Sequence, residues 1–242
     1  MPVKHIEGDG MIAALFSGGK DSTLALHKAS REGSKPDLLI TMHSGNPDSY
    51  MFHKPNIAFT SMQAEALGIK HIVWFTEGKK EKELEDLERA LEENGVKTLV
   101  TGAIASTYQK ARVDALCKKL GIIHIAPLWG ADPVEEITEV ASTMTAIITK
   151  VAAEGFDQSF LGKVIDARVI DRLLQLNKKY RINVAFEGGE AESFVLDAPM
   201  FAKSIEITKA HAVWNGMTGE YVIEDAKLVE KKGHEAHHAH MQ

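Results

Sequence analysis

Ser17-Gly18-Gly19-Lys20-Asp21-Ser22 is the stretch that decides the fold of this chain. It comes directly after the apolar run of residues 11–16 and directly before residues 23–27, whose pattern is typical of a helix. Consecutive backbone N–H groups and the positive end of a helix dipole then meet at one point, where they attract a polyanion such as phosphate. Two glycines let the backbone approach that polyanion without a Cβ in the way. The sequence therefore predicts a nucleotide phosphate cradle between a strand and a helix.

The residues beside the glycine pair suit the same cradle. Ser17 and Ser22 offer hydroxyl donors at the helix start, and Asp21 suits either the helix N-cap or a contact to magnesium. The stretch lacks the long spacer of a Walker A loop and the spaced glycines of a dinucleotide fold. It resembles instead the PP-loop, Ser-Gly-Gly-x-Asp-Ser, of the N-type ATP pyrophosphatases. That resemblance implies attack on the α-phosphorus of ATP, release of pyrophosphate and an adenylated substrate.

Composition indicates a globular protein with one large domain, or with a main domain and a smaller one. The chain has 242 residues, of which 44% are hydrophobic and 26% charged. No apolar run approaches the roughly 20 residues that span a bilayer, and residues 1–10 contain no apolar signal core, so we expect a cytoplasmic protein. The formal net charge of −6 disfavours non-specific binding to nucleic acid.

The single cysteine, Cys117, lies in the helical pattern of residues 113–120, where we expect it to pack in the core. PP-loop enzymes that thiolate tRNA commonly rely on a cysteine pair or an iron–sulfur cluster. One cysteine supplies neither, so the sequence argues against sulfur transfer.

Short apolar runs alternate with longer amphipathic segments over the first part of the chain. The sequence predicts strands at 38–42, 71–75, 98–101 and 146–149, and helices at 61–67, 79–94, 106–120 and 133–144. This alternation predicts an α/β fold of the PP-loop type, with a doubly wound, mostly parallel sheet that helices cover on both faces. Ligands of such sheets bind beyond the carboxyl ends of the strands. Ser17, His43-Ser44, Thr76-Glu77 and Gly102-Ala103 each follow a predicted strand and are expected to converge there.

The pattern changes after residue 154. A helix at 166–180 leads through an apolar segment at 184–186 into a loop rich in Gly and Glu, and then into strands at 204–208 and 221–224 that a turn at 214–216 joins. We therefore predict a PP-loop ATP-binding domain over 1–154, a smaller substrate-binding α+β domain over 155–230, and a disordered His-rich tail over 231–242.

The second unusual stretch is Glu187-Gly188-Gly189-Glu190-Ala191-Glu192-Ser193-Phe194-Val195-Leu196-Asp197. Three glutamates beside a tight glycine turn suit three tasks, namely to orient an ammonium group, to hold magnesium or to act as a base. The same composition also suits a solvent-exposed acidic turn. Residue types alone leave these alternatives open.

This second stretch, placed after a PP-loop, resembles the signature of the diphthine–ammonia ligase family, the enzymes of diphthamide synthesis. Further segments agree with the resemblance, which covers about residues 13–201. These are residues 78–87, Gly102-Ala103-Ile104-Ala105-Ser106-Thr107-Tyr108-Gln109 with Arg112, Pro127-Leu128-Trp129-Gly130, and Leu161-Gly162. The chain departs from the family at Ala131, where an arginine is usual, and at residues 155–158.

The resemblance implies ATP-dependent amidation of diphthine on translation elongation factor 2, with ammonium as nitrogen donor and with diphthamide, AMP and pyrophosphate as products. ATP and Mg²⁺ are the expected cofactors. The implied ATP-binding residues are Ser17, Gly18, Gly19, Lys20, Asp21, Ser22, Met42 through its backbone, His43, Gly102 and Ala103. The implied substrate-binding residues are Ser106, Tyr108, Gln109, Arg112, Glu187, Gly188, Gly189, Glu190, Glu192 and Asp197. Asp21, Glu190 and Arg112 are the expected catalytic residues, and no further metal ligand is assigned.

Two alternatives stay open at this point. The first is a PP-loop ligase or thiolating enzyme that acts on tRNA, and the second is a non-catalytic ATP-binding regulatory module. The expected partners are the diphthine-bearing elongation factor and ammonium. We expect neither a membrane nor a nucleic acid as partner, and the sequence leaves homo-oligomerisation open.

Overall fold

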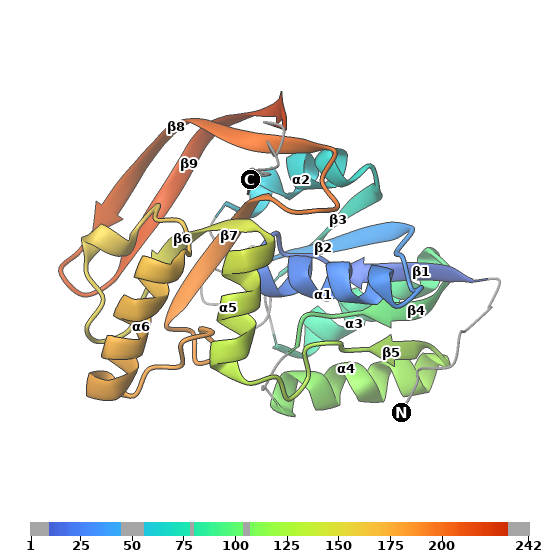
Figure 1. Ribbon diagram of the computed structural model, residues 1–242. Coiled ribbons are helices and arrows are strands. Elements are labelled where there is room, and N and C mark those ends of the chain that lie inside the picture. Colours follow the sequence, from blue (N-terminus) through green and yellow to red (C-terminus); the bar gives the residue numbers. More distant parts are fainter. Residues whose placement is uncertain (1–9, 45–55, 78–79, 104–106, 232–242) are drawn as a thin grey trace, which may run out of the picture.

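The strand that precedes the glycine pair lies in the middle of a parallel sheet in the computed structural model, which describes residues 10–44, 56–77, 80–103 and 107–231. The five strands of this sheet lie in the order β3-β2-β1-β4-β5 and all pair in parallel (Figure 1). The predicted α/β class is confirmed. The elements of this part are β1 Met11–Leu15, α1 Lys20–Arg31, β2 Leu38–Ser44, η1 Ile57–Phe59, α2 Thr60–Leu67, β3 Lys70–Thr76, α3 Lys80–Glu93, β4 Val96–Val100, α4 Thr107–Leu120 and β5 Ile123–Ile125.

Helices cover both faces of the parallel sheet. Leu39 of β2 packs in one hydrophobic cluster with Leu24 of α1, whereas its neighbour Leu38 packs in another cluster with Leu87 of α3 and Leu116 of α4. Successive side chains of a strand point to opposite faces, so β2 is buried on both sides. This explains why its sequence reads as a continuous apolar run.

Cys117 packs in the second of these clusters, as predicted, and is 1% exposed. Burial, together with the nearby carboxylate of Asp114, raises the pKa of the Cys117 thiol to about 11. The thiolate, which is the reactive form, is therefore scarce at neutral pH.

A second, antiparallel sheet forms from the rest of the chain, in the order β7-β6-β9-β8 (Figure 1). The elements of this part are α5 Pro133–Thr143, β6 Thr145–Val151, η2 Gln158–Phe160, α6 Ala167–Tyr180, β7 Ala191–Asp197, β8 Lys203–Trp214 and β9 Gly219–Glu230. The predicted hairpin of two strands is confirmed, although both strands are longer than expected. Asn215 forms its turn, because its side-chain oxygen accepts from the N–H groups of Met217 at 3.0 Å and Thr218 at 2.8 Å.

Three sequence-based expectations need correction. The strand predicted at 146–149 belongs to the antiparallel sheet, where it pairs with β7 and β9. It is buried on both faces, as strands of parallel sheets are, so its sequence does not reveal which sheet it joins. Residues 191–197, expected as part of a loop, form β7, and the short strand β5 was not predicted. The second sheet thus begins at Thr145, before the predicted boundary at 155, and the division into two domains stays a prediction.

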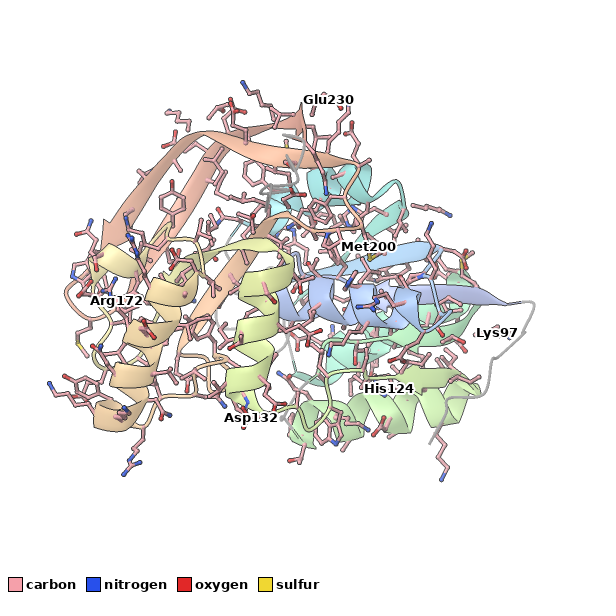
Figure 2. All side chains as sticks on the ribbon, in the orientation of Figure 1. Lys97, His124, Asp132, Arg172, Met200 and Glu230 are labelled. Carbon is pink, nitrogen blue, oxygen red and sulfur yellow. The ribbon has the colours of Figure 1, made fainter. Side chains whose placement is uncertain are left out.

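Aspartate caps start the two helices that flank the second sheet. The carboxylate of Asp132 accepts from the N–H groups of Val134 at 2.8 Å and Glu135 at 3.0 Å, and Pro133 occupies the first turn of α5. The carboxylate of Asp166 likewise accepts from Val169 N at 2.8 Å at the start of α6. Figure 2 shows Asp132 at the end of α5 that lies between α6 and α4 in this view.

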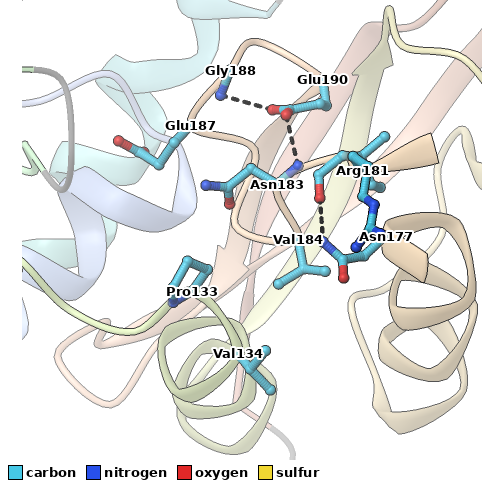
Figure 3. A pocket seen from close by; sticks show the side chains of 10 residues that line it. Pro133, Val134, Asn177, Arg181, Asn183, Val184, Glu187, Gly188 and Glu190 are labelled. Atoms are coloured by element: carbon cyan, nitrogen blue, oxygen red, sulfur yellow. Dashed lines mark hydrogen bonds between the residues drawn. The ribbon is translucent and has the colours of Figure 1, made fainter. Parts of the chain in front are cut away.

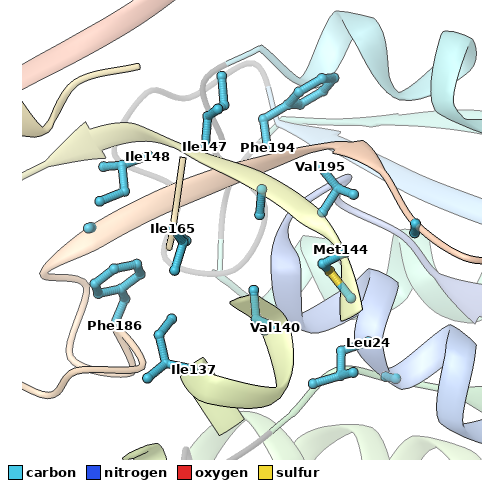
Figure 4. Packing of buried hydrophobic residues seen from close by; sticks show 14 of the residues in the cluster. Leu24, Ile137, Val140, Met144, Ile147, Ile148, Ile165, Phe186, Phe194 and Val195 are labelled. Atoms are coloured by element: carbon cyan, nitrogen blue, oxygen red, sulfur yellow. The ribbon is translucent and has the colours of Figure 1, made fainter. Parts of the chain in front are cut away.

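One hydrophobic core joins the two sheets. Leu24 of α1, Val140 of α5, Ile147 of β6 and Phe194 of β7 belong to a single cluster of buried side chains. Figure 4 shows Ile137 and Val140 of α5 below the strands β6 and β7, and Met144 above Leu24 of α1. The two parts of the chain therefore stabilise each other by burying a common apolar surface.

None of the helices in the described ranges combines the length and the apolar character that crossing a membrane requires. Of the predicted His-rich tail, only Lys231 lies within the described residues.

Candidate active site

The strand ends that the sequence singled out lie at one edge of the parallel sheet. β3, β2, β1 and β4 are neighbours and run in the same direction. Thr76, His43, Ser17 and Gly102 therefore come together at the carboxyl edge, where ligands of such sheets bind. His43 and Ser44 are the last two residues of β2, and Thr76 is the last residue of β3, rather than the positions after these strands.

The glycine pair makes a tight connection between β1 and α1. Gly18 has a φ of +76°, in the left-handed region that favours glycine, and a Cβ built on it would lie 2.1 Å from the side-chain oxygen of Gln63. Gly19 is the N-cap of α1, so Asp21 lies in the first turn and is not the cap. The Ser22 hydroxyl donates to Gly19 O at 3.1 Å and lies 3.3 Å from the Ser17 hydroxyl.

Several backbone N–H groups of this loop remain open to a ligand. Within the described part of the chain, the N–H groups of Gly19, Asp21 and Ser22 have no hydrogen-bond acceptor. These groups are the first donors of α1 and point along the positive end of its dipole. These N–H groups can therefore donate hydrogen bonds to the negatively charged oxygens of a ligand.

Gly102 lets the end of β4 approach the same turn. A Cβ on Gly102 would lie 2.7 Å from the carbonyl carbon of Asp21 and 2.8 Å from the N atom of Ser22. Both neighbours are backbone atoms, so a side chain here would displace the first turn of α1. Gly102 is therefore adjacent to the glycine loop, and Ala103 is partly buried, while the nucleotide wall that both would form stays a prediction.

The side chain of Lys20 is fully buried instead of facing a ligand. Its Nζ donates to Glu136 Oε1 of α5 at 2.8 Å and also pairs with the carboxylate of Asp21. It lies 5.4 Å from the ring centroid of Phe186. The expectation that Lys20 contacts the ATP phosphates is thus not supported for its ammonium group, because the interior of the protein holds that group.

This buried cluster contains one cation and two carboxylates. Burial by itself lowers the pKa of Lys20, but the carboxylates of Asp21 and Glu136 outweigh that effect and raise it. Burial, followed by the neighbouring Asp21, raises the pKa of Glu136 to about 8, although Lys20 acts in the opposite direction. The second oxygen of Glu136 has no hydrogen-bond partner among the described residues. Because Glu136 keeps its proton to a higher pH than an ordinary carboxylic acid, the cluster comes close to electrical neutrality near pH 7.

A cavity of about 560 Å³ opens between α5, the end of α6 and the loop before β7 (Figure 3). Phe186, whose ring faces Lys20, immediately precedes Glu187, which lines this cavity. The cavity therefore adjoins the buried cluster behind the glycine loop. Its lining residues are Pro133, Val134, Asn177, Arg181, Ile182, Asn183, Val184, Glu187, Gly188 and Glu190.

Glu190 closes the loop that borders this cavity. One of its carboxylate oxygens accepts from Asn183 N at 2.7 Å and the other from Gly188 N at 2.8 Å (Figure 3). Phe186 has a φ of +68°, which is uncommon for a bulky residue and accompanies functional sites in many proteins. The turn also uses Gly189 at a φ of +81°. Glu190 thus holds the loop by both oxygens, and its predicted catalytic role stays a prediction.

Glu192 and Asp197 are not among the residues that line the cavity. The carboxylate of Glu192 lies 3.7 Å from Nζ of Lys150, the residue of β6 that is opposite Glu192 in the strand pair. Asp197 lies at the other end of β7, with its carboxylate 2.8 Å from Nζ of Lys231. The structure therefore separates them from Glu187, Gly188 and Glu190, and a role in substrate binding stays a prediction for both.

The predicted substrate residues after β4 occupy the first turns of α4. Arg112 Nη1 donates to the hydroxyl of Tyr108 at 2.9 Å, and its guanidinium lies 5.2 Å from the centroid of that ring. Gln109 is half-buried between them, and Ser106 lies outside the described residues. This contact holds the guanidinium of Arg112 over the ring of Tyr108. The predicted roles of these residues in substrate binding, and of Arg112 in catalysis, stay predictions.

An aromatic pair lies near the carboxyl ends of the neighbouring strands β2 and β3. The ring of His43 lies 5.2 Å from that of Phe75, which is 71% exposed, whereas the side chain of Met42 is buried. A nucleotide could therefore reach Met42 only through its backbone, and the predicted contact stays a prediction. The flat, exposed ring of Phe75 was not predicted as part of the site.

Sequence reasoning missed three residues that contact the glycine loop, namely Glu136, Gln63 and Ser193. Glu136 had a recognisable signal, because it lies on the same side of α5 as the buried Ile137 and Val140. A carboxylate at such a position needs a buried partner. Gln63 and Ser193 had no signal of this kind, since each contacts the loop from a distant part of the chain.

Comparison with known proteins shows which chains resemble this one. Residues 10–124 match the model of the diphthamide synthase N-terminal domain, and residues 132–229 match that of the diphthamide synthase C-terminal domain. A diphthine–ammonia ligase from Rattus norvegicus is 33% identical over 226 residues, which cover 84% of each chain. Its counterpart from Bos taurus is 34% identical with the same coverage.

Two further similarities are more partial. The diphthine–ammonia ligase of Schizosaccharomyces pombe is 34% identical over 226 residues, which cover 84% of this chain and 37% of that protein. Among solved structures, a predicted subunit of tRNA methyltransferase from Methanocaldococcus jannaschii superposes with a TM-score of 0.42 and 20% identity, covering 78% of this chain and 98% of that one. A likeness this weak carries no argument about function.

The buried cluster predicts an unequal pattern of stability among three variants, namely Lys20→Met, Glu136→Met and the double variant of both. Lys20→Met leaves the two carboxylates without their cation and should lower the free energy of unfolding by about 3–5 kcal/mol. The double variant Lys20→Met with Glu136→Met removes the stranded charge and should recover most of that loss, since apolar pairs often replace buried ion pairs well. Urea unfolding measures all three free energies. Losses that simply add in the double variant would contradict this description of the cluster.

Proposed function

This chain belongs to the diphthamide synthase family, and from that premise we propose that it catalyses the ATP-dependent amidation of diphthine on translation elongation factor 2. Ammonium supplies the nitrogen, and diphthamide, AMP and pyrophosphate are the products. The observation that carries the proposal is the set of open backbone N–H groups at Gly19, Asp21 and Ser22, next to the buried cluster that adjoins the cavity.

The reaction needs activation because a carboxylate has no good leaving group. In the proposed sequence, a carboxylate oxygen of diphthine bonds to the α-phosphorus of ATP and the bond from that phosphorus to pyrophosphate breaks. Ammonia then attacks the carbonyl carbon of the acyl-adenylate, AMP leaves with the former carboxylate oxygen, and the nitrogen loses a proton. Holding ATP and the carboxylate next to each other lowers the barrier of the first step.

The glycine loop contributes to that first step by stabilising charge. Negative charge accumulates on the phosphate oxygens as pyrophosphate separates, and N–H groups fixed in place before the reaction stabilise it without reorganising. Gly19, Asp21 and Ser22 supply such groups, and the dipole of α1 adds to them. Gly102 keeps the opposite wall close enough to confine the nucleotide.

Magnesium fits this site only together with the nucleotide. The described residues contain no group of three or more His, Cys, Asp or Glu side chains that could hold a metal ion. Mg²⁺ is commonly held by one or two carboxylates and the phosphates of a substrate, and the side chain of Asp21 is 34% exposed beside the loop. Asp21 would therefore hold Mg²⁺, which would neutralise part of the triphosphate charge.

The cavity beside the buried cluster is the proposed place for the diphthine side chain. It is lined on one side by Pro133 and Val134 of α5 and on the other by the loop that carries Glu187. Its volume of about 560 Å³ lies within the usual range for small-ligand pockets. Glu187 is the proposed contact for a cationic group of the substrate or for ammonium, whereas both carboxylate oxygens of Glu190 accept hydrogen bonds from the backbone.

Free ammonium is the proposed nitrogen donor. Cys117 is buried and its pKa is raised, so it does not have the setting of a glutaminase nucleophile. A separate protein that supplies ammonia remains compatible with the proposal.

The direct test incubates the protein with ATP, Mg²⁺, ammonium and elongation factor 2 that carries diphthine. We expect AMP, pyrophosphate and the amide to appear in equal amounts, and the amide to be absent when ammonium is omitted. AMP and pyrophosphate are followed by chromatography, and the modified peptide by mass spectrometry. ATP binding without AMP formation on this substrate would contradict the proposal and favour a tRNA substrate or a regulatory role.

The cavity predicts a selective effect of Glu187→Gln. Loss of this carboxylate should raise the KM for the diphthine-bearing protein about 10-fold, because hydrogen bonds to charged groups are the stronger ones, while the KM for ATP stays nearly constant. Glu154→Gln is the matched control, since Glu154 is exposed and lies outside the cavity lining. Equal KM values in the two variants would exclude Glu187 from substrate binding.

A further inference from the structure

Strand β7 docks directly on the glycine loop. The hydroxyl of Ser193 accepts a hydrogen bond from Lys20 N at 3.0 Å, and Val195 N donates to Gly18 O at 3.0 Å. The two segments are 173 residues apart in the chain. The antiparallel sheet therefore supplies polar contacts to the loop of the parallel sheet.

Gln63 of α2 completes the same set of contacts. Its side chain is fully buried, and its Nε2 donates to Gly18 O at 2.9 Å and to Val195 O at 2.8 Å. Its Oε1 occupies the space that a Cβ on Gly18 would need. Gln63 thus ties the loop and β7 together and lies against the glycine whose φ of +76° shapes the loop.

Ser193 performs the task that a local cap would normally perform. The first N–H groups of a helix lack acceptors within the helix, and a Ser, Thr, Asp or Asn at the N-cap usually supplies one. The N-cap of α1 is Gly19, which has no side chain to do so. Ser193 accepts from Lys20 N, while the N–H groups of Gly19, Asp21 and Ser22 have no acceptor among the residues that the structure describes.

We propose that Ser193 and Gln63 are positioning residues that hold the glycine loop in the shape that binds the phosphates of ATP. This inference rests on the proposed function, since it takes a triphosphate as the ligand of the loop. Neither residue touches the nucleotide in this proposal. Each acts through the loop, Ser193 by capping α1 and Gln63 by fixing the carbonyl of Gly18.

The same contacts connect the two parts of the proposed active site. The loop with Glu187 and Glu190 lines the cavity and continues directly into β7, where Ser193 and Val195 meet the glycine loop. The contacts of Ser193, Val195 and Gln63 with the glycine loop therefore set the spacing between the bound nucleotide and the substrate cavity. Ser193 thus has a role in ATP binding, although it lies in the stretch 187–197, which was expected to bind the diphthine substrate.

The test compares Ser193→Ala with Ser193→Thr and with Ser204→Ala. Threonine keeps the hydroxyl, and Ser204 lies on β8 of the same sheet. Isothermal titration with ATP and Mg²⁺ measures the Kd, and thermal unfolding measures the Tm. We expect Ser193→Ala to raise the Kd for ATP about 3- to 10-fold with a nearly constant Tm, and both other variants to bind ATP as the unchanged protein does.

Gln63→Met provides a second variant that keeps the volume of the side chain and removes the donor. It should weaken ATP binding in the same way while the cavity still accepts its substrate. Unchanged ATP affinity in Ser193→Ala and Gln63→Met would overturn the inference, as would a loss of affinity that only follows a loss of folded protein.

The readout separates this inference from the proposed function. ATP binding is measured without diphthine or ammonium. ATP binding that depends on Ser193, in a protein that forms no amide, would support the positioning role of Ser193 and contradict the proposed amidation. If the unchanged protein does not bind ATP, both are wrong.

Discussion

The docking of the glycine loop against β7 is the constraint on which the rest of the site depends. Gly18 contacts both Val195 and Gln63, so the loop keeps its shape only while the antiparallel sheet stays in place. The hydrophobic cluster that includes Leu24 and Phe194 holds the two sheets together. A change in the second sheet is therefore expected to affect ATP binding, although ATP would bind at the edge of the first.

The buried cluster of Lys20, Asp21 and Glu136 connects the same two parts through charge. Glu136 lies one turn after Pro133 and Val134, which line the cavity, while Asp21 lies in the first turn of α1. Lys20 bridges them at a point with no exposed surface of its own. Because its raised pKa keeps Glu136 largely protonated near neutral pH, the cluster joins the two elements with little net charge.

Much of this architecture could be predicted because its signals are local. The order of strand, glycine pair and helix follows from residues 11–27, and the convergence of Ser17, His43 and Gly102 follows from the parallel direction of the strands. Contacts made across the chain could not be predicted in this way. The burial of Lys20 by Glu136, the cap from Ser193 and the sheet that residues 145–151 join all depend on segments that no local pattern connects.

The central claim is that the loop directs attack on the α-phosphorus of ATP, and an isotope experiment tests it most directly. Elongation factor 2 whose diphthine carboxylate carries ¹⁸O in both oxygens is converted with unlabelled ATP, and the AMP is analysed by mass spectrometry. The account predicts one ¹⁸O atom in each AMP formed, because the carboxylate oxygen leaves with the adenylate. AMP without ¹⁸O, or label in inorganic phosphate with ADP as product, would contradict it.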